Sequence, residues 1–131
     1  MTESLVLGIS ETVIGFYRAL DLRQEPAEEF FAREGVWMRM GQALQGREAI
    51  RSALASRDVS RISCHLVSNL RARAVASGKA ESDYFVTVYE GMSDAPMRLV
   101  GILNAHDELV LVEGQWRISH KHSRRHLPFT P

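Results

Sequence analysis

The N-terminal part of the chain carries hydrophobic residues at intervals of three and four, the period of an amphipathic helix. The clearest such face consists of Ile9, Val13, Phe16, Tyr17 and Leu20. Pro26 favours the start of a second, short helix that runs through Phe30 and Phe31. A third helix is expected to open at Gly46, with Ala49, Ile50, Ala53 and Leu54 on its buried side. The pattern therefore predicts three helices before the middle of the chain.

The remaining segments have the patterns of β-strands. Alternation between Gly35 and Gly41 predicts a short strand at 36–40. Longer strands are predicted over 61–75, 80–89, 98–112 and 116–125, and the short turns between them favour antiparallel hairpins. This order of elements predicts an α+β fold in which three N-terminal helices pack on a strongly curved, mainly antiparallel sheet. We expect one cone-shaped domain over 1–131, with a basic C-terminal tail from about residue 121.

Both faces of the expected sheet carry apolar residues. Leu66 and Leu70 alternate with Val67, and Tyr84 alternates with Phe85. One face can fill the cone, but the other needs a partner to cover it. A homodimer through the sheet face is therefore expected.

The charge balance narrows the range of partners. Sixteen basic and sixteen acidic residues cancel, which gives no reason to expect binding to nucleic acid or to an anionic membrane surface. No apolar run approaches the roughly 20 residues that a membrane span needs. Cys64 is the only cysteine, so an intrachain disulfide is impossible and a cytoplasmic location is expected.

Four segments, taken in order, resemble the SnoaL-like branch of the NTF2-like superfamily: FYRALD at 16–21, GREAIR at 46–51, CHLVSN at 64–69 and GQWRI at 114–118. The resemblance covers about residues 8–125 and implies the cone fold. Scytalone dehydratase-like members carry an Asp at the end of the first helix and a His in an H-x-x-x-N segment of the sheet. Asp21, His65 and Asn69 match those positions. A second pocket histidine of that branch has no clear counterpart here, which leaves the particular substrate open.

The matched residues suit acid/base chemistry without a cofactor. An imidazole moves protons near neutral pH, so His65 is the candidate general acid/base and Asp21 the partner that fixes its tautomer. Tyr17, one helical turn before Asp21, is the candidate hydrogen-bond donor to a substrate oxygen. The expected chemistry is dehydration or isomerisation of a small hydrophobic or polycyclic molecule. The alternative is that Asp21 only ends a helix and that His65 is a hydrogen-bonded core residue.

The candidate substrate pocket is made of large apolar or hydrogen-bonding side chains: Trp37, Met40, Tyr84, Tyr89, Asn104 and His106. Strand register decides which of Tyr84 and Tyr89, and which of Asn104 and His106, faces the pocket. Large apolar residues also suit a core. The clusters that resemble metal ligands are HDE at 106–108 and HKH at 120–122. His120 and His122 share a strand face, but no third ligand is evident from the spacing, so no metal site is expected.

A second resemblance leads to another class of function. Basic residues followed by His-x-Val-x-Asn also occur in the β subunits of ring-hydroxylating dioxygenases, which share the fold and mainly support a catalytic subunit that carries the metals. The chain is short for such a subunit and lacks the expected N-terminal extension. This resemblance implies the alternative of a non-catalytic ligand-binding or subunit-stabilising domain.

Overall fold

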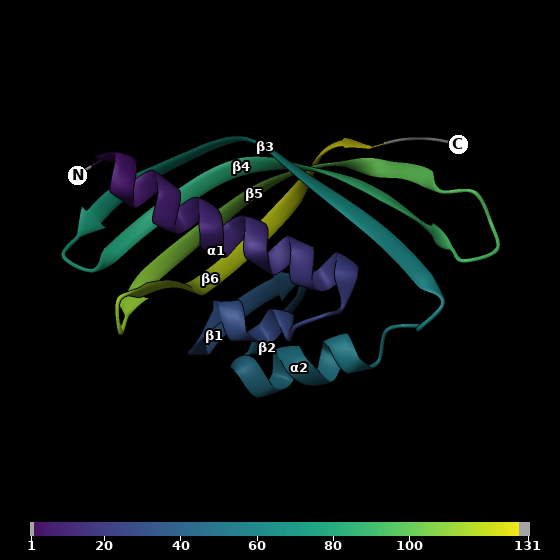
Figure 1. Ribbon diagram of the computed structural model, residues 1–131, viewed down its shortest axis with the longest axis horizontal. Helices are drawn as coiled ribbons and strands as arrows, with labels where there is room; N and C mark the ends of the chain where they lie inside the picture. The colour runs from purple at the N-terminus through teal and green to yellow at the C-terminus, as the bar shows by residue number, and fades with distance from the viewer. Residues whose placement is uncertain (1, 129–131) are drawn as a thin grey trace.

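The computed structural model describes residues 2–128 and places the helices on one face of a curved six-stranded sheet (Figure 1). The elements in chain order are α1 (Thr2–Leu22), the 3-10 turn η1 (Ala27–Phe30), β1 (Phe31–Arg39), β2 (Gln42–Gln45), α2 (Arg47–Ala55), β3 (Arg61–Ala76), β4 (Lys79–Met92), β5 (Arg98–Val112) and β6 (Gln115–Pro128). The strand order is β2-β1-β6-β5-β4-β3. Neighbouring strands are antiparallel except for β1 and β6. The α+β class and the curved, mainly antiparallel sheet are thus confirmed.

The expectation of three helices was wrong, because the second one is only the four-residue turn η1. Pro26 does open it, but the chain becomes extended again at Phe31. The Phe31 side chain is fully buried, and its backbone pairs with Ile118 of β6. Too few residues separate Pro26 from this anchored position for a run of α-helical hydrogen bonds to form.

The first strand begins earlier than predicted and returns in a hairpin that the sequence pattern did not reveal. β1 pairs with β2 through a tight turn at Met40 and Gly41, whose φ angles are 52° and 76°. Two successive residues with positive φ are typical of the turns that match strand twist. Met40 therefore lies in a turn and is 94% exposed.

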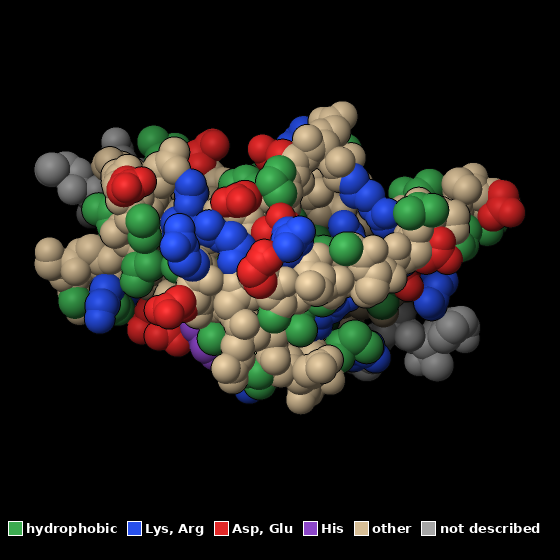
Figure 2. Space-filling model, turned by 90° about the horizontal axis from the view of Figure 1, so that it is seen from below, with side chains coloured by type: hydrophobic (Ala, Val, Ile, Leu, Met, Phe, Trp, Pro, Cys, Tyr) green, Lys and Arg blue, Asp and Glu red, His purple; other side chains and the backbone are tan. Residues whose placement is uncertain are grey.

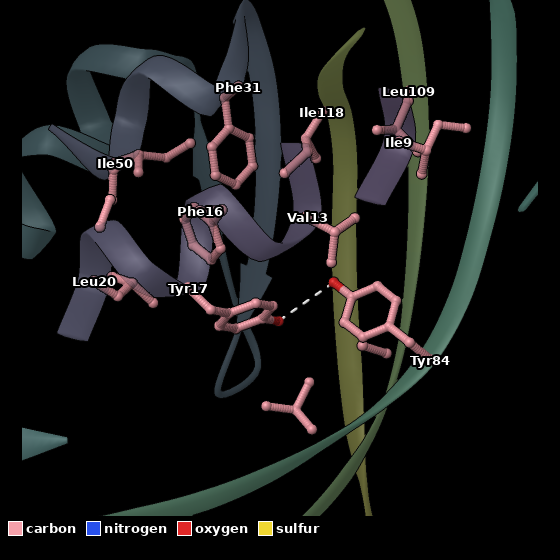
Figure 3. Packing of buried hydrophobic residues seen from close by; sticks show 14 of the residues in the cluster. Ile9, Val13, Phe16, Tyr17, Leu20, Phe31, Ile50, Tyr84, Leu109 and Ile118 are labelled. Atoms are coloured by element: carbon pink, nitrogen blue, oxygen red, sulfur yellow. Dashed lines mark hydrogen bonds between the residues drawn. The ribbon is translucent and has the colours of Figure 1, made fainter. Parts of the chain in front are cut away.

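Among the described residues, α1 contributes more buried apolar side chains than any other element, and its predicted apolar face is confirmed. Ile9, Val13 and Phe16 are fully buried (Figure 3). The helix runs close to its neighbours at two glycines. A Cβ atom at Gly15 would come within 2.5 Å of the Phe30 ring, and one at Gly8 within 2.9 Å of Trp116. This close approach fixes α1 diagonally across the sheet (Figure 1).

Asn69 marks the point where β3 bends. It has a φ of 55°, and the pairing of β3 with β4 shifts between Ser68 and Arg71. Asparagine tolerates this left-handed conformation better than most residues. The bulge resets the alternation of side chains, so that Leu70 packs against the core. The Asn of the H-x-x-x-N segment thus has a structural role.

The two faces of the sheet differ sharply. We call the face covered by α1 the inner face; on β4 it carries the buried residues Ser82, Tyr84, Val86 and Val88. The opposite, outer face leaves Leu66 and Leu127 about half exposed. The basic stretch from Lys121 lies within β6, and positions 129–131 of the expected tail lie outside the described residues. Within residues 2–128, no helix is long and apolar enough to cross a membrane.

Candidate functional site

A pocket of about 710 Å³ opens between α1 and the inner face of the sheet, with further walls from β1 and α2. Its volume lies in the range that holds small organic ligands. The apolar part of its wall consists of Leu20, Trp37, Met40, Leu54, Val88, Val100 and Leu103.

His65 and Asp21 meet at the wall of this pocket. The imidazole Nδ1 lies 2.7 Å from Asp21 Oδ1, and the backbone N–H of His65 donates to Oδ2 over 2.7 Å. Ser63 Oγ donates to Oδ1 over 2.8 Å. The side chains of His65 and Asp21 are only 15% and 12% exposed. Asp21 is the second-last residue of α1, and β3 places Ser63 and His65 on the same face because they are two positions apart.

The hydrogen bonds to Asp21 define its charge and the tautomer of His65. Burial alone would raise the pKa of Asp21, but the hydrogen bonds and charge of His65, together with the Ser63 hydroxyl, bring it below its ordinary value of 3.8. An ionised carboxylate only accepts hydrogen bonds, so Nδ1 of His65 must donate. In the neutral ring Nε2 is then the acceptor, which is the form that a general base needs.

Tyr17 links the His65 pair to the core. Its ring stacks on the His65 imidazole, with centroids 5.2 Å apart and planes at 30°. Its hydroxyl lies 3.3 Å from the hydroxyl of Tyr84 (Figure 3). The Tyr17 oxygen also accepts a hydrogen bond of 3.3 Å from Lys121 Nζ. Tyr17 therefore lines the pocket while its hydroxyl reaches a charged group beneath it.

That charged group belongs to a buried network that the sequence reasoning missed. Lys121 Nζ donates to both carboxylate oxygens of Asp107, over 3.0 and 2.9 Å, and to the hydroxyl of Tyr84, which itself donates to Asp107 over 2.8 Å. Lys121 is 1% exposed and Asp107 is fully buried. Burial alone would lower the pKa of Lys121, but the charge of Asp107 outweighs it and raises the pKa. Burial and the same carboxylate raise the pKa of Tyr84 well above its ordinary value.

Turn spacing alone does not predict this ion pair. Val112 pairs with Gln115 across the turn, so an unbroken antiparallel register would place Asp107 opposite His120. A shift in the pairing of β5 with β6, between Glu108 and Leu109, places Asp107 opposite Lys121 instead. The contact therefore depends on this irregularity of the sheet.

The predicted site residues divide between the pocket and other places. Tyr17, His65, Trp37 and Met40 line the pocket, with Met40 at its rim. Asp21 lies behind His65 and is reached through it.

The placement of the other four predicted pocket residues is corrected. Tyr84 faces inward, but it is 2% exposed and belongs to the buried network. Tyr89, Asn104 and His106 do not line the pocket. Their cross-strand partners are Cys64, Phe85 and Asp83, so they lie on the outer face. His106 Nδ1 is 2.7 Å from Asp83 Oδ1 there.

No set of three or more His, Cys, Asp or Glu side chains within residues 2–128 is arranged to hold a metal ion. His120 and His122, the clustered histidines of β6, have ring centroids 6.3 Å apart. The pocket wall is instead rich in arginines from three strands and two connecting segments, and the sequence reasoning did not single these out.

Comparisons with known proteins agree on the family and on the fold. The model of the SnoaL-like domain matches residues 5–122. A search of curated proteins found no match. Among solved structures, ActVI-ORFA from Streptomyces coelicolor has a TM-score of 0.81 at 16% identity. The alignment covers 94% of this chain and 98% of the ActVI-ORFA chain.

Two further structures show the same fold. Aln2 from a Streptomyces species has a TM-score of 0.81 at 19% identity, covering 93% of this chain and 91% of its own. An NTF2-like protein with a cystatin-like fold from Novosphingobium aromaticivorans has a TM-score of 0.79 at 14% identity. The alignment covers 94% of this chain and 82% of the Novosphingobium chain. The family match covers most of the sequence, and it includes every residue of the pocket wall except Ser123, Arg124 and Arg125. The chain belongs to the SnoaL-like domain family and has the NTF2-like fold.

Proposed function

We propose that this protein binds a small hydrophobic or polycyclic molecule and transforms it by proton transfer, without a cofactor. The observation that carries the proposal is the 2.7 Å contact between His65 Nδ1 and Asp21 at the wall of the pocket. A nearly buried, oriented imidazole beside an apolar cavity is the arrangement that general acid/base catalysis requires.

The roles follow from the hydrogen bonds. Asp21 holds the Nδ1 proton and stabilises the imidazolium that forms when Nε2 takes a proton from substrate. For dehydration, Nε2 removes a proton from carbon and returns it to the departing hydroxyl group, which leaves as water. For isomerisation, the same proton returns to a different carbon atom. Neither reaction consumes a co-reactant, so lyase or isomerase chemistry fits the site.

Tyr17 is the candidate donor to a substrate oxygen where negative charge develops. The Tyr84 hydroxyl proton is engaged by Asp107, and Lys121 donates to the Tyr17 oxygen. The acceptor nearest to the Tyr17 proton is the Tyr84 oxygen at 3.3 Å, so donation to a substrate requires the proton to turn away from Tyr84. An ammonium group at its oxygen makes the phenol a stronger donor, because it withdraws electron density from the O–H bond.

The alternative is a non-catalytic ligand-binding or subunit-stabilising domain. In this alternative the pocket still binds a ligand, but the contact between Asp21 and His65 is only structural. The hydrogen bonds that Asp21 accepts from Ser63 and His65 then serve to hold the end of α1 against β3. The two functions differ in what the loss of the imidazole does, which makes them separable by experiment.

A thermal-shift screen of polyketide-, terpenoid- and steroid-like compounds identifies ligands, and each ligand is then incubated with the protein and followed by mass spectrometry and NMR. We expect turnover that falls by at least about 100-fold in His65→Ala and in Asp21→Asn. His122→Ala, which removes an exposed imidazole, is the matched control and should keep full turnover. Unchanged turnover in His65→Ala would contradict the catalytic roles. Ligands that bind but are never converted would favour the non-catalytic alternative.

The outer face of the sheet supports a second part of the proposal, that two copies pair through it in the cytoplasm. Ile62 is 43% exposed, Leu66 51% and Leu127 52%, all on this face. Cys64 lies among them, and a reducing compartment would keep its thiol unpaired. Light scattering after size exclusion should give a dimer for the wild type and a monomer for Leu66→Glu. A monomeric wild type would contradict the pairing.

A further inference from the structure

Six arginines surround the pocket: Arg23, Arg39, Arg57, Arg61, Arg124 and Arg125. Among the described residues, Glu90 is the only carboxylate in the pocket wall. The arginines come from β1, β3 and β6 and from the segments that follow α1 and α2, so the fold gathers them from distant parts of the sequence. The pocket is therefore strongly positive although the protein as a whole has no net charge.

This concentration of charge is not a general property of the surface. On the face of the molecule seen in Figure 2, acidic side chains lie among the basic ones. The sixteen basic and sixteen acidic residues of the chain balance. Low-dielectric walls strengthen the field of charges that line a cleft, so the same arginines act more strongly here than on an open surface.

Two of these arginines donate hydrogen bonds to groups that do not neutralise them. Arg57 donates to the backbone oxygens of Leu54 and Leu20, and Arg23 donates to the backbone oxygens of Asp58 and Arg61. These acceptors hold the guanidinium groups in place but carry no full charge. Only Arg61 forms a close ion pair within the wall, with Glu90 at 2.6 Å.

Arg39 is the most distinctive of the six. Its guanidinium lies over the ring of Trp37, with Cζ 5.1 Å from the ring centroid. Within residues 2–128 it has no hydrogen-bonding partner and no ion pair, although its side chain is partly buried. Its planar group is thus held by the indole, with its donors available to a ligand.

The arginines also repel one another. Burial lowers the pKa of Arg39, and the neighbouring charge of Arg61 lowers it further. Burial likewise lowers the pKa of Arg57, and the charges of Arg23, Arg61 and Arg39 add to this. A bound anion would relieve this repulsion, because it favours the charged form of each group.

We propose that the ligand of this pocket is an organic acid with a flat, mostly apolar body and an ionised carboxylate, and that Arg39 is the main carboxylate-binding residue. The apolar body packs against Trp37 and the aliphatic wall, and the carboxylate accepts two hydrogen bonds from the planar guanidinium. This inference rests on the proposed function, for which it supplies the substrate class. The anchored carboxylate is a non-reacting group that orients the substrate towards His65.

The test compares 2-naphthoate with 2-naphthalenemethanol by isothermal titration calorimetry at pH 7. The two probes share the same flat body and differ in the ionised carboxylate. We expect the wild type to bind the acid at least about tenfold more tightly than the alcohol. The preference should shrink when the salt concentration is raised from 50 mM to 500 mM, because salt screens the arginines.

Variants locate the origin of the preference. Arg39→Gln should bind both probes with similar affinity, whereas Arg39→Lys should keep part of the preference because it keeps the charge. Arg18→Gln, on the exposed side of α1 and away from this pocket, should behave as wild type. Circular dichroism melting curves verify that each variant is folded.

The outcomes separate this inference from the proposed function. Equal affinity of the wild type for acid and alcohol would overturn the anionic class and leave the pocket's function intact. Failure of the wild type to bind either probe would overturn both. A preference that survives in Arg39→Gln would overturn the role of Arg39. Binding does not require turnover, so the measurement decides the substrate class even if His65 performs no chemistry.

Discussion

Two acid–base pairs lie under the same helix, and they differ in their access to the pocket. Lys121 and Asp107 form one pair, at most 1% exposed. His65 and Asp21 form the other, with 15% and 12% of their side chains exposed at the pocket wall. Tyr17 contacts both, through its hydroxyl on one side and its ring on the other.

The comparison shows how burial assigns different tasks to similar contacts. The sealed pair, Lys121 and Asp107, keeps fixed charges. Removing one partner would leave the other charge unpaired in a dry core, which costs several kcal/mol. The pair at the wall contains an imidazole whose second nitrogen is not bound by Asp21. The first pair therefore supports the core and orients Tyr17, and the second is suited to chemistry.

The largest effect is expected from Lys121→Met. This change leaves Asp107 as an uncompensated buried charge and should lower the free energy of unfolding by about 3–5 kcal/mol in urea titrations. Lys79→Met, on the exposed start of β4, is the control and should lie within about 0.5 kcal/mol of wild type.

The double variant Lys121→Met with Asp107→Leu sharpens this prediction. It removes both charges and should recover much of the lost stability. A single variant Lys121→Met with wild-type stability would show that the sealed pair does not carry the structural role.

Asp21→Asn should lower the free energy of unfolding by a smaller amount, about 2 kcal/mol at pH 7. The substitution weakens charge-assisted hydrogen bonds at a partly exposed site. The folded-state pKa of Asp21 is below its unfolded value, so its contribution is present above about pH 3.8 and is lost as the pH falls through the folded pKa. The stability difference between wild type and Asp21→Asn should therefore narrow below pH 4 in urea titrations. A difference that widens on acidification would have the wrong sign for this account.

Asn69→Ala should lower the free energy of unfolding by about 1 kcal/mol, because alanine is strained in the left-handed conformation at the β3 bulge. Asn69→Gly should lie near wild type, because glycine adopts positive φ without steric cost. Thermal melting of the two variants checks the prediction. Equal loss in both would instead indicate that the Asn side chain itself matters, and would return it to the list of candidate site residues.

The smallest effect on stability is expected from His65→Gln, about 1 kcal/mol or less, because glutamine keeps a donor for Asp21 and the site is open to the pocket. The same variant should abolish any proton-transfer activity. Chemical denaturation together with turnover of an identified ligand measures both quantities. A His65→Gln protein that is as destabilised as Lys121→Met would place His65 with the structural pair.

The sequence allowed the prediction of the elements and, through the family resemblance, of one contact between distant residues. The helical face of Phe16 and Tyr17, the four long strands and the meeting of Asp21 with His65 all depend on local periodicity or on a motif. Asp21 was found because it ends a clear helix and because its partner lies in a matched segment.

Register and long-range assembly could not be predicted in the same way. A shift of one residue moves a strand side chain to the opposite face, which is why Tyr89, Asn104 and His106 were misplaced. The arginines around the pocket come from segments as distant as Arg23 and Arg125, and no local pattern joins them. Charge of this kind becomes visible only after the fold has brought the segments together.

The central claim is that His65 offers a free Nε2 to the pocket while Asp21 holds the Nδ1 proton. Long-range ¹H–¹⁵N correlation NMR of the imidazole rings tests it most directly, at a pH where the His65 ring is neutral. The account predicts the Nδ1–H tautomer for His65, a mixture of tautomers in Asp21→Asn, and a change in the Nε2 shift when 2-naphthoate is added. A wild-type ring that carries its proton on Nε2 would contradict it.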